Sequence, residues 1–131
     1  EDITEQKAQR DALEYMAMHD ALTDLPNRAL FYDRVYQALL SAEHSQTQAA
    51  VLLMDLNNFK VINDTLGHHT GDKILKEVAR RLKNAVKAYD TVARMGGDEF
   101  LVLLSDITEE QAMRITKRLK QPVAESRATI S

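Results

Sequence analysis

Two groups of acidic residues in the sequence could hold a divalent cation. Asp55 follows a short apolar run, and Asp98 and Glu99 follow a pair of glycines, Gly96 and Gly97. Magnesium prefers oxygen ligands, and proteins usually hold it with one or two carboxylates together with the phosphates of a substrate. If the fold brings the two groups together, they could bind magnesium and a nucleotide. Their spacing alone also fits a solvated acid at a strand end and an ordinary hairpin turn.

The residues around these acids predict the strands that would position them. The apolar run 49–54 predicts a short strand buried on both faces, with Asp55 at its exit. Residues 91–94 and 100–104 predict two further strands joined by Gly-Gly-Asp-Glu, because paired glycines supply the positive φ that a tight hairpin turn needs. A β-hairpin would therefore present two carboxylates at its tip.

Four helices are predicted around these strands. Residues 4–18 contain no Pro or Gly and few apolar residues, which indicates an exposed connecting helix that could pair with a copy of itself. A second helix begins after the capping residue Asn27, residues 74–86 form the third, and a fourth follows a capping box of Thr108 and Gln111. The apolar positions that mark the last three helices are Leu30, Phe31, Val35, Leu39 and Leu40, then Ile74, Leu75, Val78, Ala79, Leu82, Ala85 and Val86, then Ala112, Ile115 and Leu119.

The order of these elements predicts the fold class. It indicates one α/β domain of the α+β sandwich type, with a mixed, largely antiparallel central sheet flanked by helices. A chain of 131 residues has room for one hydrophobic core, so we expect a connecting helix at 1–18 and one folded domain at 19–131. A Gly-containing loop is expected after Asp55. Residues 128–130 predict a last strand that the end of the sequence cuts off, so the domain is expected to lack its C-terminal part.

Composition narrows the partners that the chain could have. The net charge is −3 and there are no cysteines, so we expect no basic stripe for a nucleic-acid polymer and no disulfide or thiolate metal site. No apolar run approaches the ~20 residues that span a bilayer. We therefore expect a cytoplasmic domain with no direct membrane contact, although its parent protein could be attached to the inner membrane.

Four sequence segments together resemble the GGDEF domain family. Residues 94–100 read RMGGDEF and match the signature that names the family, and residues 19–28, HDALTDLPNR, look like its entry motif. Residues 55–64, DLNNFKVIND, look like its metal- and base-binding segment, and residues 65–72, TLGHHTGD, continue the match. The segments occur in the family's order and spacing, and the resemblance covers the chain from about Met18 to its end.

The resemblance implies an activity, a metal and a fold. Similar domains have the nucleotidyl cyclase or palm fold and are diguanylate cyclases, which work as homodimers and condense two GTP into cyclic di-GMP with release of pyrophosphate. They depend on Mg²⁺, and Mn²⁺ is a possible substitute. By resemblance, Asp55, the backbone carbonyl of Leu56 and Asp98 would hold the metal. Asp98 would help to deprotonate the attacking hydroxyl, with Glu99 as a close alternative.

The resemblance also implies a set of substrate-binding residues. Asn63 and Asp72 would hydrogen-bond guanine, since an amide and a carboxylate suit its donors and acceptor. Two alternatives stay open: Asn63 as a turn residue, and Asp72 as the N-cap of the helix that follows. His68 would lie beside the nucleotide, and a transition-metal site at His68 and His69 is a minor rival. The remaining implied substrate-binding residues are Phe59, Lys60, Gly96 and Gly97.

One motif departs from the family pattern. Similar domains carry Arg-x-x-Asp shortly before the signature for inhibition by product, and the matching positions here are Lys87 and Asp90. Arginine presents a planar, bidentate donor, whereas lysine presents one flexible point charge. We therefore expect a degenerate inhibitory site with weak or absent feedback, which titration of an active preparation with cyclic di-GMP would measure.

The flanking sequence suggests neighbouring domains and an alternative function. Residues 2–7 resemble the exit of a PAS sensor domain, and residues 65–72 and 120–123 look most like GGDEF domains that precede an EAL phosphodiesterase. The alternative to catalysis is therefore a GTP-binding regulatory domain that controls an attached EAL domain. A purely structural or dimerisation domain would require the acidic residues to be incidental.

Overall fold

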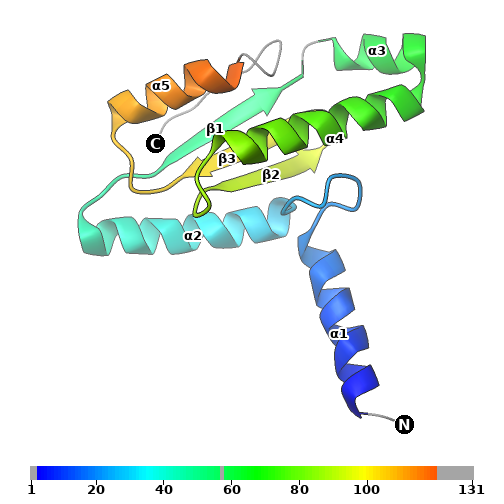
Figure 1. Ribbon diagram of the computed structural model, residues 1–131. Helices are drawn as coiled ribbons and strands as arrows, with labels where there is room; N and C mark the ends of the chain where they lie inside the picture. Colours follow the sequence, from blue (N-terminus) through cyan, green and yellow to red (C-terminus); the bar gives the residue numbers. More distant parts are fainter. Residues whose placement is uncertain (1–2, 57, 121–131) are drawn as a thin grey trace.

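The computed structural model describes residues 3–56 and 58–120 as one layered α/β body with a helix projecting from it (Figure 1). The elements, in chain order, are α1 (Ile3–Met18), α2 (Arg28–Ser45), β1 (Ala50–Asp55), α3 (Phe59–Leu66), α4 (His68–Ala85), β2 (Thr91–Gly96), β3 (Glu99–Leu104) and α5 (Glu109–Lys120). The predicted α/β class, the strand exit at Asp55 and the hairpin are confirmed. The predicted strand at 128–130 lies outside the described residues.

The described strands form an antiparallel sheet in the order β1-β3-β2. Strand β3 pairs with both neighbours, so the hairpin strand β3 is central and β1 lies along its other edge. In Figure 1, β1 and β2 point the same way, toward the end of the sheet where α3 lies. The largely antiparallel sheet that the sequence predicts is confirmed for this part of the chain, which includes no parallel pair.

Helices cover both faces of the sheet, and they cover them unequally. The main core lies between one face of the sheet and helices α4 and α5, with Leu82, Phe100 and Leu119 fully buried in it. On the other face, Phe31 of α2 packs on Ala93 and Leu103. Strand β1 consequently alternates between buried and partly buried residues instead of being fully buried on both faces as predicted.

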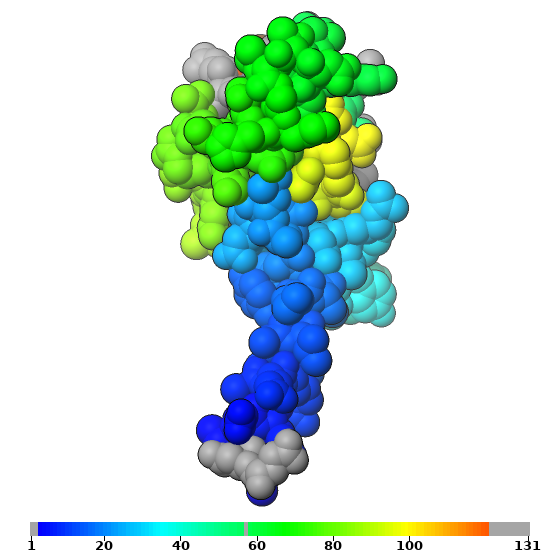
Figure 2. Space-filling view, turned by 90° about the vertical axis from the view of Figure 1, so that its right-hand side faces the viewer, coloured from blue at the N-terminus to red at the C-terminus, as the bar shows by residue number. Residues whose placement is uncertain are grey.

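Helix α1 extends away from the body of the domain (Figures 1 and 2) and buries none of its residues. Its last turn is tied to the following loop, because Asn27 Nδ2 donates to the carbonyl of Ala17 at 2.8 Å. The exposed helix that the sequence predicts is therefore confirmed, and its role as a connector stays a prediction. Among the described residues, no helix is long and apolar enough to cross a membrane.

Two parts of the helix prediction are wrong. Leu39 and Leu40 of α2 are 57% and 48% exposed, because they lie off the helix face of Phe31, Val35 and Ala38 that packs on the sheet. The loop expected after Asp55 instead contains α3, and α4 begins at His68 rather than at residue 74. Gly67 separates these helices with φ +93°, a conformation that glycine adopts at little cost.

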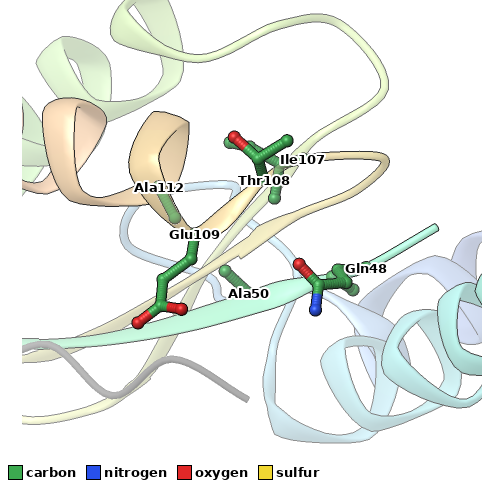
Figure 3. A pocket seen from close by; sticks show the side chains of 7 residues that line it. Gln48, Ala50, Ile107, Thr108, Glu109 and Ala112 are labelled. Carbon is green, nitrogen blue, oxygen red and sulfur yellow. The ribbon is translucent and has the colours of Figure 1, made fainter.

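A cavity of about 190 Å³ lies where β1 begins and α5 starts. Figure 3 shows Gln48, Ala50, Thr108 and Glu109 among the residues around it. The capping box predicted here is confirmed, since Thr108 N–H donates to Gln111 Oε1 (3.0 Å) and Gln111 N–H to Thr108 Oγ1 (3.2 Å). Because Asp55 is at the opposite end of β1, this cavity is remote from the predicted site.

Candidate functional site

The two acidic groups come together where β1 ends beside the tip of the hairpin. In the register of β1 and β3, Asp55 is the partner of Glu99. One residue further on, the N–H of Leu56 donates to the carbonyl of Asp98 at 3.2 Å. The main chain thus fixes all the predicted metal-site and catalytic residues in one short stretch of two adjacent strands. Asp55 and Asp98 are half-buried, and Glu99 is exposed.

The hairpin turn leaves an open surface at its glycines. Gly96 is the strand partner of Glu99, and the pairing is irregular between Arg94 and Gly96, which indicates a β-bulge there. Gly97 has φ +53°, the left-handed region that favours glycine in tight turns. A Cβ atom added at Gly96 or Gly97 would meet no described residue within 4 Å apart from its chain neighbours. The main chain at the tip is therefore accessible to a ligand.

Arg94 stabilises the hairpin tip by hydrogen bonds to its main chain, a role that the sequence did not reveal. Its Nε and Nη2 donate to the carbonyl of Gly97 at 3.1 and 2.9 Å. Its Nη1 donates to both carboxylate oxygens of Asp20, at 3.0 and 3.2 Å. The side chains of Arg94 and Asp20 are only 14% and 19% exposed. Arg94 therefore connects the turn to the loop between α1 and α2.

Asp20 is itself held in place by its own loop. The N–H and Oγ1 of Thr23 both donate to Asp20 Oδ2, at 2.9 and 2.7 Å. Burial raises the pKa of Asp20, but the hydrogen bonds from Thr23 and Arg94 outweigh it, so the pKa of this carboxyl lies below its usual value. Asp20 therefore stays ionised near neutral pH and provides a fixed charge for Arg94.

Helix α3 begins four residues after the end of β1 and carries two predicted substrate residues in its first turn. Phe59 is buried in the main core, whereas Lys60 is exposed. Asn58 precedes them in the left-handed conformation with φ +60° and makes no side-chain cap. The first N–H groups of a helix lack partners within it. Lys60 and this uncapped first turn could therefore bind an anion near Asp55.

Asn63 lies on α3 against helix α4. Its Oδ1 is buried and has no hydrogen-bond partner among the described residues. A buried acceptor without a partner is rare in folded proteins and calls for a physical explanation. Asn63 is inside a helix, so its alternative interpretation as a turn residue is wrong.

His68 and Asp72 are exposed on the first turns of α4. They are four residues apart, which places them on one face of the helix. Asp72 is the fifth helical residue and the N-cap position is Gly67, so the alternative interpretation of Asp72 as an N-cap is wrong. The first two turns of α4 therefore present an imidazole and a carboxylate on one face of the helix.

The donor set at the strand end fits magnesium better than a transition metal. Asp55, Asp98 and the carbonyl of Leu56 provide oxygen ligands on adjacent strands. Within residues 3–56 and 58–120, no three His, Asp or Glu side chains converge as a ready-made metal cluster. A site without such a cluster can still bind magnesium, because this ion is commonly held by few protein ligands and completes its coordination shell with water and substrate phosphates.

Lys87 and Asp90, the predicted degenerate inhibitory site, lie on the loop before β2. Asp90 accepts from the N–H of Lys87 at 3.0 Å and from the N–H of Ser105 at 3.1 Å, so it stabilises this loop. The Lys87 amine is 5.6 Å from the ring centre of Tyr89, and its interaction with Tyr89 raises the pKa of Lys87. Both residues line a cavity of about 380 Å³ that also includes Arg118. Weak feedback stays a prediction.

Comparison with known proteins identifies the family. The family model described as "Diguanylate cyclase, GGDEF domain" matches residues 17–131. MucR from Pseudomonas aeruginosa, a bifunctional diguanylate cyclase/cyclic di-GMP phosphodiesterase, is 45% identical over 92% of this chain and 18% of its own length. The diguanylate cyclase TpbB from the same species is 45% identical over 82% of this chain and 25% of its own length.

Solved structures agree with this result. The GGDEF domain of TpbB matches with a TM-score of 0.77 and 39% identity, over 86% of this chain and 69% of that one. The coiled coil and GGDEF domain of DgcB from Caulobacter crescentus, in complex with c-di-GMP, matches with a TM-score of 0.83 and 26% identity, over 89% of this chain and 61% of that one. The chain belongs to the GGDEF family of diguanylate cyclase domains.

Proposed function

We propose that this domain is a diguanylate cyclase that condenses two GTP into cyclic di-GMP with release of pyrophosphate. The observation that carries the proposal is the pairing of Asp55 with Glu99 and of Leu56 N–H with the Asp98 carbonyl, which unites the acidic strand end with the hairpin tip. Family membership supports it, and relatives named diguanylate cyclase share 45% of aligned residues with this chain.

The metal would lie between the two strands. Asp55, the carbonyl of Leu56 and Asp98 would hold Mg²⁺ or Mn²⁺, which would neutralise charge on the phosphates of GTP. Lys60 and the N–H groups of the first turn of α3, which lack a side-chain cap, would bind the triphosphate, because both favour an anion at this position. The open main chain at Gly96 and Gly97 would let the nucleotide approach the hairpin closely.

The base would lie between α3 and α4. Asn63 offers a buried acceptor without a partner, and Asp72 offers an exposed carboxylate on the neighbouring helix. Guanine carries N–H donors at N1 and at its exocyclic amine, whereas the same edge of adenine carries an acceptor and a C–H group. Acceptors at both positions would therefore favour GTP, with His68 beside the nucleotide.

The condensation requires a general base that accepts the proton of the attacking 3′-hydroxyl group of GTP. The 3′-oxygen of one GTP would form a bond to the α-phosphorus of the other, the bond to pyrophosphate would break, and the hydroxyl proton would pass to a carboxylate. Asp98 is our first candidate for that carboxylate, and Glu99 is the alternative because it occupies the next position on the hairpin. Repeating the step with the roles of the two nucleotides exchanged closes the ring.

The product has two-fold symmetry, which suggests an antiparallel homodimer with one GTP on each protomer. The exposed helix α1 is suited to pairing and to carrying a signal from a sensor domain, because none of its residues is committed to the core. In a parent protein, a PAS-like domain before the chain and an EAL domain after it would be the corresponding partners. If the active form is a homodimer, specific activity should rise with protein concentration.

The test is product analysis. We expect purified protein at high concentration, incubated with GTP and Mg²⁺, to form cyclic di-GMP that chromatography resolves, and to form no cyclic product from ATP. GTP that binds without being converted would contradict catalysis and support a regulatory domain that controls an attached phosphodiesterase. Absence of GTP binding would contradict the site assignment itself.

A further inference from the structure

Gly71 occupies a position in α4 where the backbone does not require glycine. It is buried, it is the fourth residue of the helix, and its φ lies outside the left-handed region. Alanine is the better helix former in such a position. The reason for glycine must therefore come from what surrounds it.

The surroundings of Gly71 consist of two predicted substrate-binding residues. A Cβ atom at this position would overlap Oδ1 of Asn63, and it would be 2.9 Å from Asn63 Cγ and 3.2 Å from Phe59 Cζ. Asn63 could accommodate it only by moving its carboxamide. The absence of a side chain at residue 71 thus fixes where the Asn63 oxygen can be.

That oxygen is the buried acceptor without a partner among the described residues. Since such acceptors are nearly always paired, a bound molecule, either a water or a ligand, would have to supply the donor. The purine edge that carries the N1 and N2 hydrogens of guanine can supply that donor, and the matching edge of adenine cannot.

We propose that Gly71 is a positioning residue for base selectivity: it leaves the space in which Asn63 holds its carboxamide oxygen ready for an N–H group of guanine. The inference rests on the proposed function, because it assumes that the nucleotide is GTP. It adds that selectivity for guanine over adenine depends on the packing of α3 on α4 at one residue without a side chain.

The competing explanation is that Gly71 only allows close packing of the two helices. In that case, Gly71→Ala would lower stability and weaken GTP and ATP binding by the same factor. A role through Asn63 instead changes the ratio of the two affinities. The ratio is therefore the measurement that separates the explanations.

The experiment measures Kd by calorimetry for GTP and ATP analogues with a methylene bridge between the α and β phosphorus atoms, which cannot release pyrophosphate. We expect the preference for the GTP analogue to fall about tenfold or more in Gly71→Ala and in Asn63→Ala, because a buried acceptor matched to a substrate N–H discriminates strongly. In the Asn63→Ala background, Gly71→Ala should cause no further loss of preference. Lys76→Ala, an exposed change on the same helix, serves as the control with an unchanged ratio.

Three outcomes would overturn the proposal. An unchanged ratio in folded Gly71→Ala would overturn it alone and leave the proposed function intact. If Gly71→Ala does not fold, Asn63→Ala decides: an unchanged preference in that variant overturns the proposal. A wild-type protein that binds both analogues equally would overturn the guanine site and this inference together.

Discussion

Asp98→Ala will abolish the formation of cyclic di-GMP. Asp98 is proposed both as a ligand of the metal and as the acceptor of the hydroxyl proton, so the variant loses two contributions at once. Acid–base catalysis alone contributes about 10²–10⁴-fold, so we expect a loss of at least about 10³-fold. Initial rates of product formation, measured by chromatography at saturating GTP and Mg²⁺, check this result.

Two variants control for other causes of that loss. Asp98→Asn keeps the size of the side chain and should be as inactive as Asp98→Ala, because an amide cannot accept the proton and is a weaker ligand. Glu110→Gln, an exposed acid on α5, should keep wild-type activity. An active Asp98→Ala variant would contradict the assignment of Asp98 as proton acceptor. If Glu99→Gln were inactive in the same assay, Glu99 would be assigned that role instead.

Arg94→Ala will reduce both activity and stability. Arg94 donates to the carbonyl of Gly97 and to the carboxylate of Asp20, so its loss leaves a mostly buried Asp20 charge without its cation. Hydrogen bonds to charged groups contribute about 1.5–3 kcal/mol, so we expect a loss of about that size in the free energy of unfolding. Displacement of the hairpin by about 1 Å should reduce the rate about 10²-fold. Urea denaturation and the product assay measure the two effects.

The matched control is Arg80→Ala. Arg80 pairs with Glu77 on α4, where the two side chains are 61% and 44% exposed, so its removal should cost less than about 1 kcal/mol and leave activity unchanged. Asp20→Asn should also lower activity, because it removes the carboxylate that pairs with Arg94. Wild-type rates in Arg94→Ala would show that the hairpin does not need this support.

The predicted strands and hairpin depended on local patterns, which explains their success. A short apolar run followed by an acid and a pair of glycines between two apolar runs are signals that neighbouring residues carry. Helix α3 was missed because it has only eight residues and is separated from α4 by a single glycine, Gly67. The exposure of Leu39 and Leu40 was missed because the apolar spacing of α2 did not distinguish them from the face of Phe31, Val35 and Ala38 that packs on the sheet.

Sequence motifs could name the candidate site residues, but they could not show the distant contacts that hold those residues in place. Asp55 and Asp98 could be named from their motifs. The bond between Arg94 and Asp20 joins residues 74 positions apart, and no local pattern predicts such a pair. The close approach of the Asn63 carboxamide to Gly71 also depends on how two helices pack. Tertiary packing therefore provides the support of the hairpin and the placement of Asn63, the residue proposed to contact the base.

The most direct test of the account is a crystal structure with Mg²⁺ and the GTP analogue that carries an α,β-methylene bridge. We expect a metal ion bound by Asp55, the carbonyl of Leu56 and Asp98, the triphosphate at the first turn of α3, and guanine against Asn63 and Asp72. A nucleotide bound elsewhere, or one bound here without metal contacts to Asp55 and Asp98, would contradict it.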